Sequence, residues 1–308
     1  MPRILSAADP EAVKEAVAVL SAGEPCVLPT ETVYGLAADA TNGEAVAKVY
    51  ALKGRPSFNP LIAHVAGLAM ARRLGAFSPL AEALAAAFWP GPLTLVVPAR
   101  ADSPVAGLVA AGLDTIAVRM PAAAFPRKVI ATLGRPVAAP SANPFEGISP
   151  TTIAHVVRGL GPDAPLVIDG GPCAVGLEST IVAVEGDQIL LLRAGAVTRE
   201  ALSAHGEVAE SDGYTVRAPG MTKRHYAPTK RLRLNAESAE NGEYLIGFGP
   251  VGGDETLSEA GDLTEAAANL FSALHRADAS AAERIAVAPV PDEGLGAAIN
   301  DRLRRAAG

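Results

Sequence analysis

Apolar residues recur along the chain at two spacings, and these spacings predict an alternation of helices and strands. In residues 9–25 the apolar positions follow the helical period, with Asp9 as the expected N-cap and Pro10 at the first helical position. Short apolar runs such as CVLPT at 26–30 predict strands. By the same criteria we expect further helices at 43–54, 69–75, 80–89, 124–134, 151–161 and 198–206, and further strands at 61–65, 93–99, 115–121, 136–140 and 164–171.

Several predicted strands follow one another directly, which decides the kind of sheet. No helix is predicted between 93–99 and 115–121, and residues 179–195 predict a hairpin that turns at Gly186-Asp187. Consecutive strands of this kind pair in antiparallel fashion, whereas the helical connections favour parallel pairs. We therefore expect an α/β fold with a mixed, twisted sheet.

The composition changes near Ser211 and divides the chain. Residues 211–231 have little apolar periodicity, contain two prolines and two glycines and carry five cations, so they are typical of a linker. Beyond them, strands at 231–236, 243–249 and 284–290 and helices at 264–279 and 294–307 are predicted. We expect a first domain at 1–208, a linker at 209–229 and a small Rossmann-like α/β domain at 230–308.

The composition also limits the class of protein. A length of 308 residues suffices for two domains, and 49% hydrophobic with 19% charged residues excludes a disordered chain. The net charge of −7 argues against broad, non-specific binding to nucleic acid or membranes but permits a local basic pocket. Two cysteines provide no disulfide framework and no cysteine-based zinc site, which indicates a reducing compartment.

No segment is expected to cross a membrane. The N-terminus lacks the apolar core of a signal peptide. The most apolar long stretch, Leu80 to Ala99, is interrupted by Glu82 and by a Pro-Gly-Pro sequence at 90–92. The expectation is a soluble, cytoplasmic protein.

Polar and charged residues gather where the predicted strands end, which is where α/β folds form their ligand sites. Six groups follow this rule: Thr30, Glu31, Thr32 and Tyr34; Lys53, Arg55, Asn59 and His64; Arg119; Ser141, Asn143 and Ser149; Glu178, Ser179 and Thr180; and Arg193. Singly, each has a structural explanation as a turn cap, a surface ion pair or a core histidine. Together they supply cations, an imidazole, an amide and hydroxyls without partner carboxylates nearby in the sequence. Such a set suits a multiply anionic ligand that carries phosphates or a carboxylate.

Familiar nucleotide and hydrolase motifs are missing from the sequence. It contains no G-x-x-x-x-G-K-[ST], no H-E-x-x-H and no G-x-S-x-G. GFGPVG at 247–252 fits the dinucleotide pattern G-x-G-x-x-G, but Pro250 lies inside it and the next predicted helix begins only near Thr264. Dinucleotide binding is therefore a weak hypothesis.

Five segments and the C-terminus resemble a known family. The segments are PTETVYGL at 29–36, KGRPSFNPL at 53–61, PSAN at 140–143 followed by Ser149, LEST at 177–180, and PGMTKRHYAP at 219–228; the C-terminal segment is NDRLRRAA at 300–307. Together they resemble the threonylcarbamoyl-AMP synthases, the YrdC-like family, in its long two-domain form. The resemblance covers nearly the whole chain; MTKRHY and a short C-terminal domain are its departures.

The resemblance implies a YrdC-like catalytic domain and a reaction in which L-threonine, bicarbonate and ATP, with Mg²⁺, give threonylcarbamoyl-adenylate and pyrophosphate. Partner transferase proteins would use the product to modify tRNA beside the anticodon; direct tRNA binding is left open. The resemblance implies no protein ligand for a metal. The implied catalytic residues are Lys53, Arg55, Ser141 and Asn143; the implied ATP contacts are Arg55, Asn59, Thr115, Ser141, Ser149, Arg193, His225 and Tyr226; the implied threonine contacts are Thr32, His64, Arg119, Ala139 and Ser179.

Three other functions stay open at this point. A non-catalytic RNA-binding module would need a positive groove and stacking platforms, which the acidic net charge and 4% aromatic content disfavour. Another carbamoyl-transfer enzyme of the same fold, using carbamoyl phosphate, would share the phosphate-binding residues. A dinucleotide oxidoreductase rests only on residues 247–252.

Overall fold

The computed structural model describes residues 2–210 and 225–308, and its first part is built on one large mixed sheet. In spatial order the eleven strands are β1 (Ile4–Ser6), β8 (Leu166–Asp169), β2 (Cys26–Leu28), β3 (Gly35–Asp39), β7 (Val137–Ala138), β4 (Ile62–His64), β6 (Thr115–Arg119), β5 (Leu93–Pro98), β9 (Thr180–Glu185), β10 (Gln188–Arg193) and β11 (Glu207–Glu210). Parallel pairs such as β4–β6 alternate with antiparallel pairs such as β5–β6 and β9–β10. The predicted α/β fold with a mixed sheet is thus confirmed.

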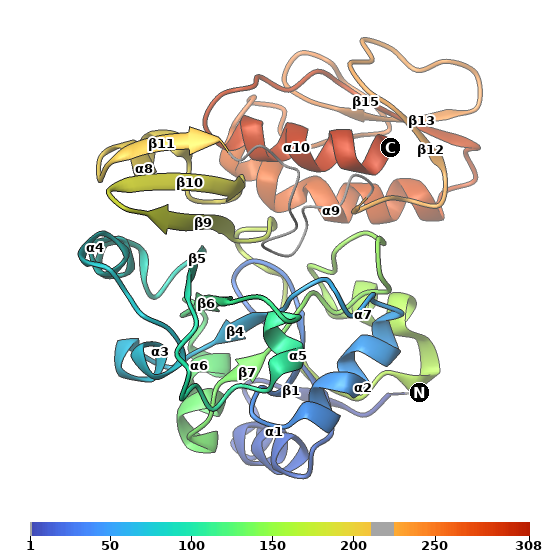
Figure 1. Cartoon of the computed structure of the whole chain (residues 1–308). Coiled ribbons are helices and arrows are strands. Elements are labelled where there is room, and N and C mark those ends of the chain that lie inside the picture. The colour runs from blue at the N-terminus through green and yellow to red at the C-terminus, as the bar shows by residue number, and fades with distance from the viewer. Residues whose placement is uncertain (1, 211–224) are drawn as a thin grey trace.

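Most of the helices of this part lie around the sheet in the lower half of Figure 1, and α8 lies beside β10 and β11 higher up. They are α1 (Ala12–Ser21), α2 (Gly43–Lys53), α3 (Leu68–Leu74), α4 (Pro79–Phe88), α5 (Gly107–Ala110), α6 (Ala124–Leu133), α7 (Ile153–Leu160) and α8 (Arg199–Ser203), with a 3₁₀ turn at Gly161–Asp163. Helix α2 shows how the sequence sets their limits. The side chain of Asn42 accepts hydrogen bonds from the first-turn amides, and Gly54 ends the helix in the left-handed conformation, with φ of 60°.

The predictions for this part need correction in two respects: the start of one helix was misplaced, and the short elements β1, β3, α5 and β11 were missed. Helix α1 begins at Ala12 with Glu11 as its N-cap; Asp9 lies before it and accepts a hydrogen bond from the Glu11 amide at 2.9 Å. Strand β3 was missed. All five of its residues are buried, so the sequence GLAAD shows no alternation of apolar and polar positions that could reveal it.

The second part of the chain forms a small parallel sheet with two helices. Its strands, in spatial order, are β12 (Arg231–Arg233), β15 (Arg284–Val287), β13 (Glu243–Gly247) and β14 (Glu255–Thr256), and its helices are α9 (Leu263–Ala279) and α10 (Leu295–Ala307). The GFGPVG loop leads from β13 to β14 and not into a helix. The dinucleotide fingerprint, which needs a helix at that place, is therefore not formed.

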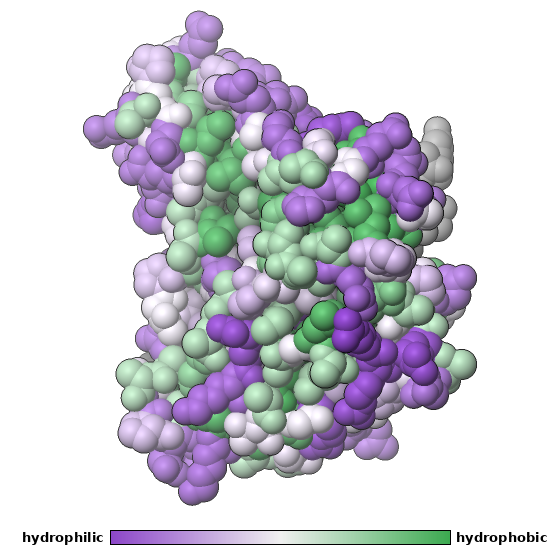
Figure 2. Space-filling model, turned by 90° about the vertical axis from the view of Figure 1, so that its left-hand side faces the viewer, coloured by the Kyte–Doolittle hydropathy of each residue, from purple (hydrophilic) through white to green (hydrophobic). Residues whose placement is uncertain are grey.

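The two parts pack against each other through apolar side chains. In Figure 1, α9 and α10 lie on the side of the small sheet that faces the rest of the molecule. Val33, Ile148 and Leu177 of the first part belong to the same buried cluster as Phe271 and Leu303 from these helices. Hydrophilic residues cover much of the outer surface in the view of Figure 2. None of the described helices is long and apolar enough to span a membrane.

Candidate functional site

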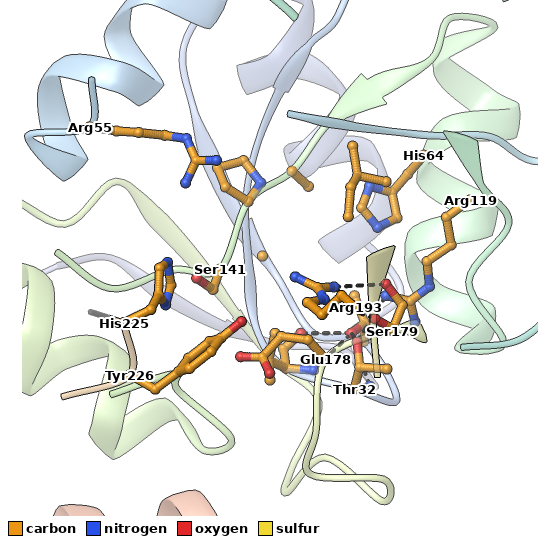
Figure 3. Close-up of a pocket in the computed structure, with 16 residues that line it drawn as sticks. Thr32, Arg55, His64, Arg119, Ser141, Glu178, Ser179, Arg193, His225 and Tyr226 are labelled. Carbon is orange, nitrogen blue, oxygen red and sulfur yellow. Dashed lines mark hydrogen bonds between the residues drawn. The ribbon is translucent and has the colours of Figure 1, made fainter. Parts of the chain in front are cut away.

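A cavity lies where several strands of the large sheet end and where the chain enters the second part. Sixteen residues line it: Thr30, Thr32, Val33, Gly35, Arg55, Ile62, His64, Arg119, Ala139, Pro140, Ser141, Glu178, Ser179, Arg193, His225 and Tyr226. In Figure 3, His64 and Arg119 lie on one side of the cavity and His225 and Tyr226 on the other. The topology explains this gathering, because β4, β6 and β10 each end with one of the charged or imidazole side chains.

Arg119 is fixed by three hydrogen bonds at the end of β6. Its Nη1 donates to the Thr32 hydroxyl at 2.9 Å, its Nη2 to the Glu31 carboxylate at 2.5 Å, and its Nε to the Gly91 carbonyl at 3.2 Å. One N–H remains on each terminal nitrogen, which is the fork that a carboxylate can accept. No partner carboxylate lies near Arg119 in the sequence, but the fold brings Glu31, 88 residues away, into contact with it.

Glu31 is held in its charged form. Burial alone would raise the pKa of this carboxyl, but the charge of Arg119 and the amide of Ala122 outweigh burial and lower it. Glu31 therefore remains a carboxylate that orients Arg119, and it also accepts a hydrogen bond from the Ala123 amide at 3.2 Å.

His64 ends β4 as the parallel partner of Arg119 in the sheet. Burial, and then the charge of Arg119, lowers its pKa to about 3, so the imidazole is neutral at neutral pH. Its Nδ1 is buried and has no hydrogen-bond partner among the described residues. The neutral ring lines the cavity, and no described residue engages this nitrogen.

Arg55 projects from the loop after α2. Its Nε and Nη2 donate to Asn59 and Pro60 oxygens at 2.6 to 3.1 Å, which holds one edge of the guanidinium. It forms no ion pair with any residue that the structure describes. Burial lowers its pKa to about 10, so the side chain stays cationic at neutral pH and its charge is available to an anion.

Lys53 does not line the cavity, although the sequence places it in the same motif. Its Nζ donates to the carbonyls of Ser141 and Asn143 at 2.6 and 2.5 Å. Burial, and then the charge of Arg55, lowers its pKa well below the ordinary value. Lys53 thus fastens the 141–143 loop to the end of α2 and does not line the cavity, so the structure gives no support to its predicted place among the catalytic residues.

Arg193 and Ser179 form the floor of the cavity beside β9. Arg193 donates through Nε and Nη2 to the Ser179 carbonyl at 3.1 and 2.8 Å, and through Nη2 to its hydroxyl at 3.1 Å. The same hydroxyl lies 2.7 Å from that of Thr94. Both predicted residues are thereby brought to the cavity in a fixed arrangement.

Ser149 and Glu178 connect the cavity wall to the last helix. The Ser149 hydroxyl donates to Oε1 of Glu178, and Nε of Arg302 donates to its Oε2 at 2.8 Å. Sequence reasoning assigned no role to Glu178 within LEST and missed Arg302 altogether. The helical spacing could have indicated that Arg302 is buried, because it shares a helical face with the buried Ile299 and Ala306.

His225 and Tyr226 complete the cavity from the start of the second part. Both are buried, and their ring centroids are 4.1 Å apart. Burial, and then the charge of Lys53, lowers the pKa of His225 well below its usual value. The MTKR residues that precede them in the MTKRHY motif, 221–224, lie outside the described residues.

The structure separates the predicted site residues into two groups. Ten line the cavity: Thr32, Arg55, His64, Arg119, Ala139, Ser141, Ser179, Arg193, His225 and Tyr226. Lys53, Asn59, Asn143 and Ser149 are buried next to them and hold their neighbours. Thr115 belongs to neither group, because it begins β6 whereas Arg119 ends it. Its prediction as an ATP contact gains no support.

Comparisons with known proteins match both parts of the chain. A family model described as telomere recombination, covering the Sua5, YciO and YrdC proteins, matches residues 18–195. A second model, described as threonylcarbamoyl-AMP synthase, C-terminal domain, matches residues 197–308. The chain is 38% identical to the threonylcarbamoyl-AMP synthase of Bacillus subtilis, over 99% of this chain and 95% of that protein.

Solved structures agree with this match. The crystal structure of Pyrococcus abyssi Sua5 complexed with L-threonine superimposes with a TM-score of 0.91 at 35% sequence identity, covering 100% of this chain and 97% of the other. A Sua5 variant from the same organism, in which a neighbouring histidine and tyrosine are replaced by alanines, gives a TM-score of 0.90 at 33% identity, covering 100% and 96%.

Proposed function

Because the chain belongs to the family of threonylcarbamoyl-AMP synthases, we propose that it condenses L-threonine, bicarbonate and ATP to threonylcarbamoyl-adenylate and pyrophosphate. The observation that carries this proposal is the cavity itself, where three arginines, a neutral histidine and several hydroxyls converge. A ligand with one carboxylate and several phosphates needs such a set. The match over both parts of the chain favours the synthase over the RNA-binding and carbamoyl-phosphate alternatives.

The threonine site of the proposal lies around Arg119. Its two remaining N–H groups bind the threonine carboxylate, and Glu31 and Thr32 keep the guanidinium in place. His64 offers an uncharged nitrogen, and Ala139 and Ser179 line the walls close by. The neutral state of His64 matters, because a cation there would repel the ammonium group of the substrate.

The ATP site of the proposal lies between Arg55 and the His225–Tyr226 pair. Arg55 and Arg193 neutralise the phosphates, and Ser141 donates a hydrogen bond to them. Asn59 supports Arg55, whereas Lys53 and Asn143 shape the loop that carries Ser141. His225 and Tyr226 cover the nucleotide and keep water away from the reacting groups.

The chemistry then needs little covalent help from the protein. After its ammonium group loses a proton to solvent, the threonine amine attacks the carbon of CO₂, one C=O π bond opens onto oxygen, and a second amine proton leaves to give the carbamate; when bicarbonate is the donor, its hydroxyl takes up that proton and leaves as water. The carbamate oxygen attacks the α-phosphorus of ATP, and the bond to the β-phosphate breaks to release pyrophosphate. Positioning of the three substrates and neutralisation of charge by the arginines lower the barrier. This reaction would class the protein as a nucleotidyltransferase.

Mg²⁺ enters this proposal as part of the substrate. Among the described residues no three His, Cys, Asp or Glu side chains are grouped to hold a metal. The acidic residue that lines the cavity, Glu178, has both oxygens engaged by Ser149 and Arg302. We therefore propose that Mg²⁺ arrives bound to the phosphates of ATP, which is a common way for proteins to use it.

The remaining parts of the proposal concern the setting of the protein. The product would pass to transferase proteins that modify tRNA. A cytoplasmic location agrees with Cys26 and Cys173 being free thiols. We propose domain limits of 1–208 and 230–308 with a connecting linker at 209–229, most of which lies outside the described residues.

An omission experiment tests the proposed function. Purified protein is given MgATP, and pyrophosphate release is followed with threonine and bicarbonate each present or left out. The proposal predicts release only when both are present. Release without threonine would instead indicate a different acceptor or simple ATP hydrolysis, and would refute the proposal.

A further inference from the structure

One arginine in the last helix is buried at the boundary between the two parts of the molecule. Arg302 lies in α10 and is 0% exposed. A buried arginine is costly unless each of its donors finds a partner. The identity of those partners therefore indicates what Arg302 holds in place.

The guanidinium of Arg302 connects α10 to the cavity wall. Its Nε donates to Glu178 at 2.8 Å and its Nη2 to the Ala194 carbonyl at 2.8 Å, both in the first part of the chain. Its Nη1 donates to Asp301, its neighbour in the helix, at 2.6 Å. Two of its three hydrogen bonds thus cross from the second part of the chain to segments that flank the cavity.

The same guanidinium also lies over an aromatic ring of the cavity. Its carbon is 4.9 Å from the centroid of the Tyr226 ring, within the range of a cation–π contact. Tyr226 has a φ of 62°, which is unfavourable for a residue with a side chain, so its conformation needs support from its neighbours. Two neighbours contact the Tyr226 side chain and provide that support. They are Arg302 and Phe271, whose ring centroid lies 5.8 Å from that of Tyr226.

Glu178 makes the charge of Arg302 necessary. A free carboxylate in a cavity that binds phosphates would repel the ligand. Arg302 balances this carboxylate, and the Ser149 hydroxyl holds its other oxygen, so Glu178 forms part of the wall without opposing an anion. Of the side chains that Arg302 contacts, Glu178 and Tyr226 line the cavity, whereas Asp301 lies beside it in α10.

We propose that Arg302 is a positioning residue for the nucleotide half of the site, through which the C-terminal domain holds Glu178 and Tyr226 in the arrangement that ATP requires. This inference rests on the proposed synthase function and extends it, because it gives the C-terminal domain a defined task. Arg302 itself need not touch a substrate.

The test replaces Arg302 and separates binding from turnover. Arg302→Ala is compared with Arg304→Ala, which removes an exposed arginine of the same helix whose ion pair with Asp292 spans 3.8 Å. Folding is checked by circular dichroism, KM values for ATP and threonine are taken from pyrophosphate release, and ATP binding is measured by calorimetry. For Arg302→Ala we expect both the KM and the Kd for ATP to rise about tenfold or more. This is the change that loss of one hydrogen bond to a charged group produces. The KM for threonine should change little, and Arg304→Ala should match the unaltered protein.

An arginine with only a structural role would give a different result. It would lower the fraction of active protein, and hence kcat, and leave the KM and Kd for ATP unchanged. That result would overturn the proposal. If Arg302→Ala does not fold, Glu178→Gln/Arg302→Met removes both charges together and avoids a buried unpaired carboxylate. The Kd for ATP of the double variant should remain higher than that of the unaltered protein, because Tyr226 has lost the cation over its ring. A Kd for ATP equal to that of the unaltered protein would overturn the proposal.

Failure of the proposed function would be recognised separately. In that case the unaltered protein would show no threonine-dependent release of pyrophosphate, whatever the effect of the variants. The calorimetric Kd for ATP does not depend on turnover, so it reports on Arg302 in either case.

Discussion

At the scale of single residues, the site depends on charges held by precise local partners. Arg119 is oriented by Glu31, Arg55 by Asn59 and Arg193 by the backbone of Ser179. Each guanidinium is therefore fixed before a ligand arrives, which reduces the ordering that binding and catalysis must achieve.

Arg55→Ala tests the residue with the clearest phosphate role. Removing a charge-assisted contact made in the transition state should cost about 2–4 kcal/mol, or roughly 30- to 1000-fold in the rate of product formation. The exposed Arg73→Ala is the matched control and should keep the normal rate. An Arg55→Ala enzyme of normal rate would contradict the assignment.

At the scale of elements, two connections between segments distant in sequence shape the site. Lys53 ties the end of α2 to the 141–143 loop, and a stacked histidine pair joins α7 to α9. Neither connection could be read from local patterns, because each partner is more than eighty residues away.

Lys53→Met tests the first of these connections. Methionine keeps the length of the side chain but leaves the buried carbonyls of Ser141 and Asn143 without their donor, which should lower the free energy of unfolding by about 1–3 kcal/mol. Urea denaturation measures this loss. Product formation should fall as well, because the loop carrying Ser141 loosens. A variant with unchanged stability would show that Lys53 does not fasten the loop.

The histidine pair should make the junction of α7 and α9 sensitive to acid. The rings of His155 and His275 stack at 3.9 Å. Burial, and then its neighbour His275, lowers the pKa of His155 to about 3; burial lowers that of His275 to about 4. Nearby Arg158 opposes protonation of both rings, as does Arg276 for His155, whereas Asp278 and the Ser149 carbonyl favour protonation of His275.

The sign of the effect follows from proton linkage. The unfolded chain takes up protons on these histidines near pH 6.5, whereas the folded chain does so only near pH 3 to 4. The free energy of unfolding should therefore fall as the pH drops from about 6.5 towards 4. His155→Phe keeps the stacked ring but removes one titrating group, so its stability should depend less on pH. His205→Phe, at an exposed position, is the control; equal pH dependence in the wild type and His155→Phe would contradict this account.

At the scale of the whole molecule, the sequence predicted the architecture better than the internal geometry of the site. Helices and strands with clear periodicity were predicted, and the direct succession of strands gave the mixed sheet. Strand β3 was missed because all its residues are buried, and the start of α1 was placed too early. Both errors concern local signals that burial or turn geometry overrides.

The site residues were predicted through motifs, and their partners were not. Ten predicted residues do line one cavity. Glu31 as the partner of Arg119 and Arg302 as the partner of Glu178 depend on contacts between segments that only the folded chain brings together. Lys53 lies in an expected motif but is bound to the 141–143 loop, and Thr115 lies at the opposite end of β6 from Arg119, so neither lines the cavity.

The central claim is that one protein joins three substrates in this cavity, and detection of the product tests it most directly. The purified protein is incubated with MgATP, threonine and isotopically labelled bicarbonate, and the products are identified by mass spectrometry. The account predicts an adenylate that contains threonine and the labelled carbon, formed in step with pyrophosphate and formed much more slowly by Arg55→Ala. Formation of AMP or ADP without any threonine-containing adenylate would contradict it.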